Sequence, residues 1–306
     1  MTTITVLGSA NMDLVVRQPR LPRPGETMFG SSFGTVPGGK GLNQAVAAAR
    51  QGGSVDFVGA VGADAYGQQL RALVAAEGIR SDGLMTVAGA TGTAHISVTD
   101  SGENSIVVVS GANATVLALS AEQRATIAGA GFLVMQCELP VAVLAEAISI
   151  ARAAGVFTVL TPAPVVALPP GFLASVDLVV PNQIEASELT GLANAEQAAA
   201  ALSAGQTWAI VTLGSEGAIV AYDGEVLGLA PARPATAVDT TAAGDSFVGA
   251  LVARLAVTDA AATGTVSPDA MIDAVRWATV AASLTVTRPG ATESLPHLAE
   301  VAAILA

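Results

Sequence analysis

Short apolar runs recur along the chain, and stretches with helical character separate many of them. The runs are Ile4–Leu7, Val55–Val58, Phe132–Met135, Phe157–Leu160, Leu178–Val180 and Ala209–Thr212. The helical stretches are Gly41–Arg50, Gly67–Ala76, Val141–Ala154 and Ala195–Ala204. Strands that alternate with helices are typical of a parallel sheet with helices on both faces. The pattern therefore predicts an α/β fold.

Two regions depart from this alternation. Met12–Val36 alternates polar and apolar positions and contains several Pro and Gly residues. Thr93–Val109 predicts a hairpin in which His95–Thr99 and Ser105–Val109 flank the turn Asp100-Ser-Gly102. Together they predict a small antiparallel flap beside the main sheet. An apolar side of such a flap would need covering by a ligand or by a second subunit.

The composition narrows the possible functions. Of the 306 residues, 52% are apolar and 12% are charged, which is typical of a folded chain. Lys plus Arg total 13 and Asp plus Glu total 25, so the net charge is −12, and no segment concentrates basic residues. We therefore expect no nucleic-acid or membrane partner bound through bulk charge. No apolar stretch reaches the roughly 18 residues that a membrane span needs.

Cysteine and histidine are scarce. The single cysteine, Cys137, cannot form an internal disulfide, and the N-terminus shows no charged-then-apolar leader, so we expect a reduced, cytoplasmic protein. His95 and His297 are the only histidines. A zinc site built from His and Cys is therefore not expected, nor is most histidine-based acid–base catalysis.

The segment Val238–Ala250 is the most informative. Ala242-Ala-Gly244 precedes a helical run that starts near Asp245. Free backbone N–H groups at a helix N-terminus suit an anion such as phosphate. A carboxylate beside that anion can accept the proton of an attacking hydroxyl during phosphoryl transfer. The structural alternative is that Asp245 only caps the helix.

A second glycine-rich turn, Gly38-Gly-Lys-Gly-Leu-Asn43, contains Lys40, the only lysine of the chain. It lacks the Gly-x4-Gly-Lys-Ser/Thr spacing of a phosphate-binding P-loop. Lys40 and Asn43 could instead offer donors to the hydroxyl groups of a polar ligand. The alternative is a plain tight turn with a surface lysine.

Polar residues also follow predicted strands at the end where parallel sheets bind ligands. Asn11 and Asp13 follow the first strand and could hold vicinal hydroxyls, and Glu138 follows Phe132–Met135. Turns built on Asn and Asp explain the same residues. Asn182 and Glu185 lie three residues apart, so they could handle phosphate and a magnesium water shell or could simply cap a helix.

In this order, the segments strongly resemble the ribokinase-like (pfkB-type) family of sugar and nucleoside kinases over nearly the whole chain. The matching segments are Asn11-Met-Asp13, Gly38-Gly-Lys-Gly-Leu-Asn43, Gly111-Ala-Asn113, Gln136-Cys-Glu138, Thr161-Pro-Ala-Pro164, Pro181-Asn-Gln-Ile-Glu185, Thr212-Leu-Gly-Ser215, Asp239-Thr-Thr-Ala-Ala-Gly-Asp245 and Val286-Thr-Arg-Pro-Gly290. The resemblance implies one doubly wound domain over residues 1–306, with a β lid formed by about 12–36 and 93–109. From the exposed apolar face of such a lid, we expect a homodimer formed through paired lids.

The implied activity is ATP-dependent phosphorylation of the 5-hydroxyl of D-ribose. Asp245 would be the base, and the backbone of Ala242, Ala243 and Gly244 would form the anion hole. The sugar would be held by Asn11, Asp13, Gly39, Lys40, Asn43, Glu138 and Asp245. Asn182 would act on phosphate and Glu185 on Mg²⁺ through water, while Thr212, Gly214, Gly217, Gly244 and Thr279 would border the nucleotide. A potassium ion would be bound by Asp239, Thr241, Thr285, Arg288, Gly290 and Ser294, several of them through carbonyl oxygens.

Alternatives remain open at this stage. Met12, close to the implied sugar site, replaces a smaller residue frequent in such kinases, so 2-deoxyribose, another sugar or a nucleoside could be the acceptor. A non-catalytic sugar-sensing protein on the same fold is the third possibility. Thr258–Asp269 predicts a low-complexity surface loop between two helices, longer than is usual in the family.

Overall fold

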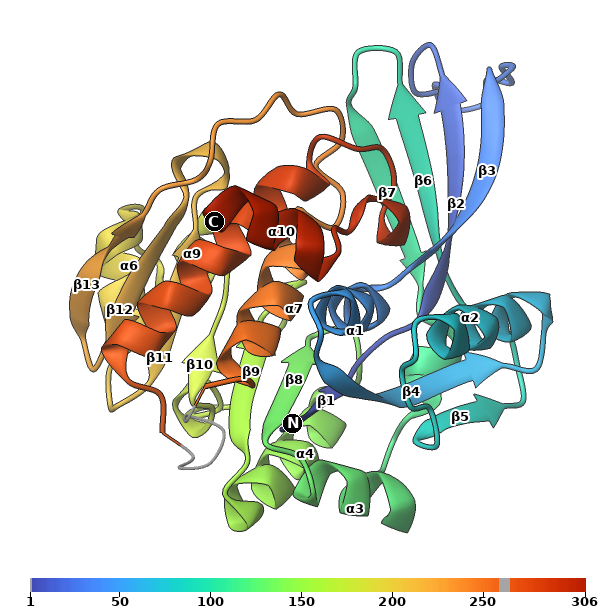
Figure 1. Cartoon of the computed structure of the whole chain (residues 1–306). Coiled ribbons are helices and arrows are strands. Elements are labelled where there is room, and N and C mark those ends of the chain that lie inside the picture. Colours follow the sequence, from blue (N-terminus) through green and yellow to red (C-terminus); the bar gives the residue numbers. More distant parts are fainter. Residues whose placement is uncertain (1, 259–264) are drawn as a thin grey trace.

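The computed structural model describes residues 2–258 and 265–306, and within them a nine-stranded sheet runs through the centre (Figure 1). Its order is β13-β12-β11-β10-β9-β8-β1-β4-β5. The strands are β1 (Thr3–Leu7), β4 (Ser54–Gly62), β5 (Leu84–Val87), β8 (Phe132–Gln136), β9 (Phe157–Thr161), β10 (Leu178–Val179), β11 (Trp208–Thr212), β12 (Ala218–Tyr222) and β13 (Glu225–Ala230). Neighbours from β5 to β11 are parallel, and β12 and β13 are antiparallel. The predicted mostly parallel sheet is confirmed.

Helices cover both faces of this sheet. They are α1 (Lys40–Arg50), α2 (Ala65–Ala76), α3 (Ala121–Ala128), α4 (Val141–Ala154), α5 (Gln183–Thr190), α6 (Ala195–Leu202), α7 (Ala243–Leu255), α9 (Pro268–Thr285) and α10 (Leu298–Leu305). Val134 packs with the α1, α7 and α9 side of the core, whereas Leu133 and Met135 pack with α3 and α4. Because strands buried on both faces need apolar residues at every position, they read as continuous apolar runs.

Local signals in the sequence explain several helix ends. Asp64 begins α2 by accepting a hydrogen bond from the backbone N–H of Gly67 at 2.8 Å. Gly52, just past the end of α1, has φ 85°, a left-handed conformation that glycine adopts without a Cβ penalty. Ser267 caps α9 and Pro268 occupies its first turn. Of the predicted loop Thr258–Asp269, residues 259–264 lie outside the described residues.

A second sheet, the lid, has the order β3-β2-β6-β7 and stands beside the carboxyl ends of the central strands (Figure 1). Its strands are β2 (Asn11–Gln18), β3 (Ser32–Gly38), β6 (Gly92–Thr99) and β7 (Asn104–Val109). The pairs β2/β3 and β6/β7 are antiparallel, as expected, whereas β2 and β6 pair in parallel with Asn11 opposite Gly92. The central pair joins two distant hairpins, which is why the sequence pattern did not reveal its direction.

Helices α1 and α7 approach each other unusually closely. A Cβ added at Gly249 of α7 would lie 2.7 Å from the carbonyl oxygen of Gln44 in α1. At the other end of the contact, a Cβ on Gly41 would lie 2.6 Å from the backbone of Gly8. Real side chains do not tolerate such distances, so glycine at both positions sets how α1 sits between β1 and α7.

Within the described part of the chain, we find no helix with the length and apolar character of a membrane span.

Candidate active site

A cavity of about 670 Å³ lies between the inner face of the lid and two loops of the main domain. Asp13, Val15 and Ile96 line it from the lid, and Asp239 and Gly290 line it from the loops. Asp13 and Val15 share a face because alternate residues of a strand point the same way. Met12, on the other face, is fully buried in the hydrophobic core and is not among the lining residues.

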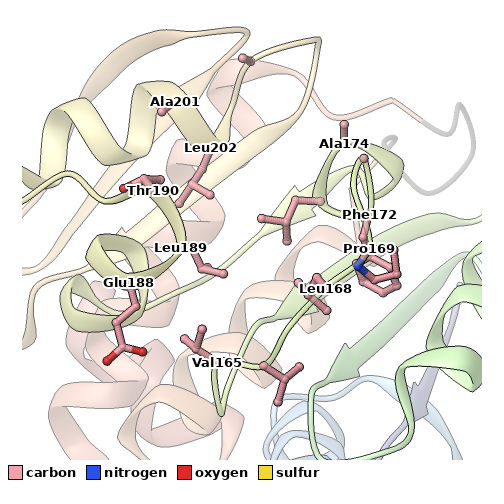
Figure 2. A pocket seen from close by; sticks show the side chains of 14 residues that line it. Val165, Leu168, Pro169, Phe172, Ala174, Glu188, Leu189, Thr190, Ala201 and Leu202 are labelled. Carbon is pink, nitrogen blue, oxygen red and sulfur yellow. The ribbon is translucent and has the colours of Figure 1, made fainter.

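A second cavity, of about 600 Å³, lies elsewhere, between the segment 165–174 and helices α5 and α6. Figure 2 shows the apolar side chains of Leu168, Leu189 and Leu202 turned toward the same space, with Glu188 to one side. None of the site residues predicted from the sequence lines this cavity. The candidate site is therefore the cleft beneath the lid.

Asp245 lies in the first turn of α7 and is buried. Its Oδ2 accepts a hydrogen bond from Asn43 Nδ2 at 3.0 Å, and its Oδ1 accepts one from Gln44 Nε2 at 2.9 Å. Burial raises the pKa of Asp245, while Lys40 and the two amide donors oppose that rise. Among the described residues, the buried Oδ1 of Asn43 has no partner, so it can accept from a ligand hydroxyl.

No side chain caps α7. Its N-cap residue, Ala242, has φ 59° and ψ 10°, a left-handed conformation that is strained for a residue with a Cβ. Ala243 and Gly244 open the helix, and a Cβ on Gly244 would meet nothing within 4 Å. The start of α7 is therefore an open helix N-terminus, which favours an anion beside Asp245.

Glu138 joins the ends of β1 and β8 to the glycine-rich turn. Ser9 Oγ donates a short hydrogen bond to Glu138 Oε2, and the backbone N–H of Lys40 donates to the same oxygen at 3.1 Å. Ser9 Oγ also accepts from the N–H of Gly41 at 3.3 Å. The carboxylate thus holds the start of α1 in place while facing the cleft.

Asn11 is fixed by a residue from a distant segment. Its Oδ1 accepts from Asn113 Nδ2 at 2.7 Å, and Asn113 Oδ1 accepts from the backbone N–H of Ala10 at 3.1 Å. Gly39 has φ 91°, and a Cβ there would lie 2.9 Å from the N atom of Asn11. Only glycine therefore lets the turn before α1 pass so close to β2.

Three carboxylates act on the single lysine, and a fourth, Asp13, interacts with two of them. Burial disfavours the Lys40 ammonium, but Asp245, Glu138 and Glu185 outweigh it and raise the pKa of Lys40. Burial, followed by Glu138 and Asp245, raises the pKa of Asp13 from 3.8 to about 7. Burial is also the main reason that the pKa of Glu185 is raised. The ligand-free cleft is thus a region of excess negative charge.

Asn182 and Glu185 form a capping box at the start of α5. The Glu185 N–H donates to Asn182 Oδ1 at 2.9 Å, and the Asn182 N–H donates to Glu185 Oε2 at 2.8 Å. The capping alternative is therefore real, yet Glu185 still interacts electrostatically with Lys40 and Asp245. Asn182 bridges to Thr212, so the starts of α5 and of the turn after β11 lie together.

The remaining residues that were predicted to border the nucleotide lie in two separate places. Gly214 and Gly217 lie in the turn between β11 and β12, and a Cβ on Gly217 would overlap the carbonyl oxygen of Ala230. Thr279 is buried in α9, where its hydroxyl donates to the carbonyl oxygen of Arg276 at 2.8 Å. The Thr279 hydroxyl is thus engaged within its own helix.

Three of the predicted cation ligands, Asp239, Thr241 and Gly290, meet where two loops touch, and the other three contact different partners. Asp239 Oδ1 accepts from the N–H and the hydroxyl of Thr241 at 2.9 and 2.6 Å, and its Oδ2 accepts from the N–H of Gly290 at 3.0 Å. Thr285 donates to Ser246 of α7 at 2.7 Å. The guanidinium of Arg288 pairs with Glu300. Ser294 is buried, and its hydroxyl donates to the Ala291 carbonyl at 2.7 Å.

The sequence reasoning missed several residues that build the site. Ser9, Gln44 and Gln136 are buried and hydrogen-bonded around Glu138 and Asp245. Asn113 and Gln136 lie inside segments that carried the family resemblance, so position in those motifs was the available signal. Ser9 and Gln44 have no charge and follow ordinary strand and helix patterns.

Comparisons with known proteins agree with this geometry. The family model described as pfkB family carbohydrate kinase matches residues 1–298. A ribokinase from Haemophilus influenzae is 38% identical over 302 residues, covering 96% of this chain and 95% of the relative. A ribokinase from Bacillus subtilis is 38% identical over 310 residues, covering 100% of both. The solved structure of Arabidopsis thaliana ribokinase complexed with ribose and ATP has a TM-score of 0.88 and 30% identity, covering 99% of this chain and 98% of that one.

The charge cluster predicts a pH-dependent effect of Asp13 on stability. With a pKa of about 7 in the folded chain and an ordinary pKa of 3.8, Asp13 destabilises the folded state progressively as pH rises from about 4 to 7. Asp13→Asn should therefore raise the free energy of unfolding at pH 8 by roughly 1–4 kcal/mol, since one pKa unit corresponds to about 1.4 kcal/mol. The gain should vanish below a pH of about 4, where Asp13 is protonated in both the folded and the unfolded chain. Urea unfolding at several pH values measures this.

The exposed Asp82 provides the matched control. Asp82→Asn should change the free energy of unfolding by no more than about 0.5 kcal/mol at either pH. An Asp13→Asn protein that is no more stable than the wild type at pH 8 would contradict the electrostatic account of the cleft.

Proposed function

The chain belongs to the pfkB family of carbohydrate kinases, and we propose that it transfers the γ-phosphoryl group of ATP to the 5-hydroxyl of D-ribose, giving ribose 5-phosphate and ADP. The observation that supports this most strongly is Asp245, a buried carboxylate held by two amides at the open N-terminus of α7. The curated relatives named ribokinase, 36–38% identical along nearly the whole chain, support ribose as the acceptor.

In this proposal, Asp245 accepts the proton of the 5-hydroxyl while the hydroxyl oxygen bonds to the γ-phosphorus and ADP leaves. Negative charge on the transferring group would be met by backbone N–H groups of Ala242, Ala243 and Gly244 at the helix N-terminus. Such charge stabilisation needs neither a histidine nor a basic surface. It therefore suits a chain with 13 basic and 25 acidic residues.

The sugar would lie against the turn before α1 and the start of the lid. Asn11, Asp13 and Glu138 supply acceptors for hydroxyl hydrogens, Lys40 and Asn43 supply donors, and Gly39 leaves room for the ring. Asn43 supports this assignment because its Oδ1 is buried and, in the described structure, makes no hydrogen bond. The Met12 side chain is buried in the core, which gives no reason to exclude the ribose 2-hydroxyl.

ATP would lie on the other side of Asp245, bordered by Thr212, Gly214, Gly217, Gly244 and Thr279. The donor set suits Mg²⁺, because Glu185 and Asn182 offer hard oxygen atoms near the phosphate position. Among the described residues there is no cluster of three or more His, Cys, Asp or Glu side chains that could hold a metal ion. Glu185 would therefore act through water on a Mg²⁺ that ATP itself carries. When bound, this ion supplies charge neutralisation to the phosphates.

A potassium ion would bind beside α7. Asp239, Thr241, Thr285, Arg288, Gly290 and Ser294 offer carboxylate, hydroxyl and carbonyl oxygen atoms, a donor chemistry that suits a monovalent cation. Asp239 already ties Thr241 to Gly290 through three hydrogen bonds. A cation there would stiffen the loop that leads into Ala242 without entering the reaction.

We further propose that residues 1–306 act as one unit and that the lid pairs with the lid of a second copy. Ile106 and Val108 on β7 are 52% and 50% exposed, and Phe33 on β3 is 65% exposed. Exposed apolar side chains on both edge strands of the lid support an interface there. Burial, with Glu185 and Glu138, raises the pKa of Cys137 to about 11, and this free, protonated thiol suits a reducing compartment such as the cytoplasm.

The first test of the proposed function is ADP release across acceptors. With ATP, Mg²⁺ and K⁺, D-ribose should give the highest kcat/KM among ribose, 2-deoxyribose, fructose and adenosine. Asp245→Asn should lower kcat by about 10²–10⁴, the usual range for a positioned base, while sugar binding persists. Asp273→Asn, which alters an exposed carboxylate of α9, is the control and should keep the wild-type rate.

Each other outcome favours a different function. Preference for adenosine or fructose would indicate a kinase for another acceptor on the same fold. Sugar binding without any ADP would indicate a sensor. Near-normal turnover of Asp245→Asn would remove Asp245 from its assigned role.

The cation proposal predicts a salt effect on rate. At equal ionic strength, activity in NaCl should be well below activity in KCl, because the loop oxygen atoms would coordinate the smaller Na⁺ ion incompletely. Asp239→Asn should reduce the difference between the two salts. Equal rates of the wild type in both salts would count against a potassium site.

The dimer proposal predicts a change in mass on altering the lid. The wild type should sediment as a dimer at micromolar concentration, and Ile106→Lys combined with Val108→Lys should convert it to a monomer, since buried lysines without partners are costly. Leu229→Lys, on the 55%-exposed position of edge strand β13, should leave the mass unchanged. A wild type that sediments as a monomer rules the lid dimer out.

A further inference from the structure

Gln44 is a buried residue that the proposed reaction does not yet use. It follows Asn43 in the first turn of α1 and is 1% exposed. Its Nε2 donates to Asp245 Oδ1 at 2.9 Å and to the Thr161 hydroxyl at 3.3 Å. Its Oε1 accepts from Gln136 Nε2 at 2.6 Å. Every polar atom of its side chain is therefore engaged on the protein's own groups.

Two consecutive residues of α1 hold the two oxygens of one carboxylate. Asn43 donates to Oδ2 and Gln44 to Oδ1, so rotation of the Asp245 carboxylate would break a hydrogen bond. The close approach of α1 and α7 at Gly249 makes this reach possible. Asn43 keeps its buried Oδ1 without a partner among the described residues, whereas Gln44 is turned toward β8 and β9 through Gln136 and Thr161.

Gln136 fixes which end of the Gln44 amide meets Asp245. Because Gln136 donates to the Gln44 oxygen, the Gln44 NH₂ group is directed at the carboxylate. In the opposite orientation, an amide oxygen would face an ionised carboxylate, which repels it. The chain Gln136–Gln44–Asp245 thus has one orientation in which the ionised base accepts a hydrogen bond.

The position of Gln136 is costly for stability. Its own Oε1 is buried and has no hydrogen-bond partner in the described part of the chain. It also lies so close to Gly8 that a Cβ there would overlap it. A buried unpaired carbonyl oxygen destabilises the folded state, and an apolar side chain of similar size would avoid that loss. Packing alone therefore does not account for glutamine at position 136.

We propose that Gln44 is a positioning residue for the general base Asp245 and that Gln136 orients Gln44 for this task. The proposal rests on the proposed function, since it takes Asp245 as the base. Gln44 would hold the carboxylate in the orientation that receives the hydroxyl proton and would favour its ionised form. Neither glutamine would touch the sugar or the nucleotide.

Other charged groups also act on Asp245. Lys40 of α1 favours its ionised form, whereas Glu138, Asp13 and Glu185 disfavour it. The donor from Gln44 lowers the pKa of Asp245, so its removal should raise that pKa further. Loss of the donor should therefore shift the acid limb of the kcat profile to higher pH, while the other charges stay the same.

The test replaces Gln44 by methionine, which has similar volume and no donor. Gln44→Met should lower kcat by about 10–150-fold, the range expected for a hydrogen bond to a charged group, with KM for ribose changed less than about threefold. Its acid limb should lie at higher pH than that of the wild type. Gln136→Met should lower kcat less, and adding it to Gln44→Met should cause no further loss, because both act through one contact.

The control is Gln51→Met in the same structural region. Gln51 caps the C-terminal end of α1, is also buried and donates to the Pro296 carbonyl at 2.8 Å, away from the cleft. This variant should keep the wild-type kcat and pH profile. Gln44→Glu supplies a second probe if methionine prevents folding: it keeps an acceptor for Gln136 but places a carboxylate against Asp245, so kcat should fall at least as far.

The outcomes separate this proposal from the proposed function. If the wild type phosphorylates ribose but Gln44→Met and Gln44→Glu both keep kcat within twofold, Gln44 is not a positioning residue. A loss of kcat with an unmoved acid limb and with additive Gln136→Met would also overturn the proposal. A wild type without kinase activity on any acceptor, by contrast, would mean that the proposed function itself fails.

Discussion

The close packing of α1 against α7 is the constraint on which the rest of the site depends. Glycine at positions 41 and 249 lets α1 lie against the end of β1 and against α7 at distances no side chain would permit. As a result, the N-terminal parts of both helices meet, and Asn43 and Gln44 reach the carboxylate of Asp245. The glycine-rich turn before α1 and the start of α7 are therefore held together by one contact.

The cleft contains a group of carboxylates that lowers the stability of the folded protein but suits ligand binding. Glu138, Glu185 and Asp245 act on a single lysine, Asp13 interacts with Glu138 and Asp245, and burial raises the pKa of Asp13, Glu185 and Asp245. A folded chain optimised for stability alone would not collect these charges. Hydroxyl groups of a sugar and a metal-bound nucleotide can both offset the excess of acceptors. The polar groups whose burial is least favourable are thus those proposed to bind the ligands.

Much of the fold could be read from the sequence, because its signals are local. Apolar runs marked the central strands, and the residues flanking α1 marked its start and its end. The parallel pairing of β2 with β6 could not be predicted from the sequence, because it brings together Asn11 and Gly92 from distant segments of the chain. Of the site, charged residues and glycines were predicted because their chemistry or conformation is distinctive. Ser9, Gln44 and Gln136 were missed because an uncharged residue becomes informative only when its partners are known.

Asn182, Glu185 and Ala242 show why a structural role does not compete with a functional one. The capping box at α5 orients Glu185 through the same bond that satisfies the helix end. At α7 the opposite arrangement holds: no side chain caps the helix, and Ala242 keeps a left-handed conformation that costs about 1–2 kcal/mol. A serine or aspartate cap would relieve the free N–H groups, but it would occupy the place of an anion. The uncapped, strained start of α7 is therefore the arrangement that the proposed function requires, in which a phosphate takes the place of a cap.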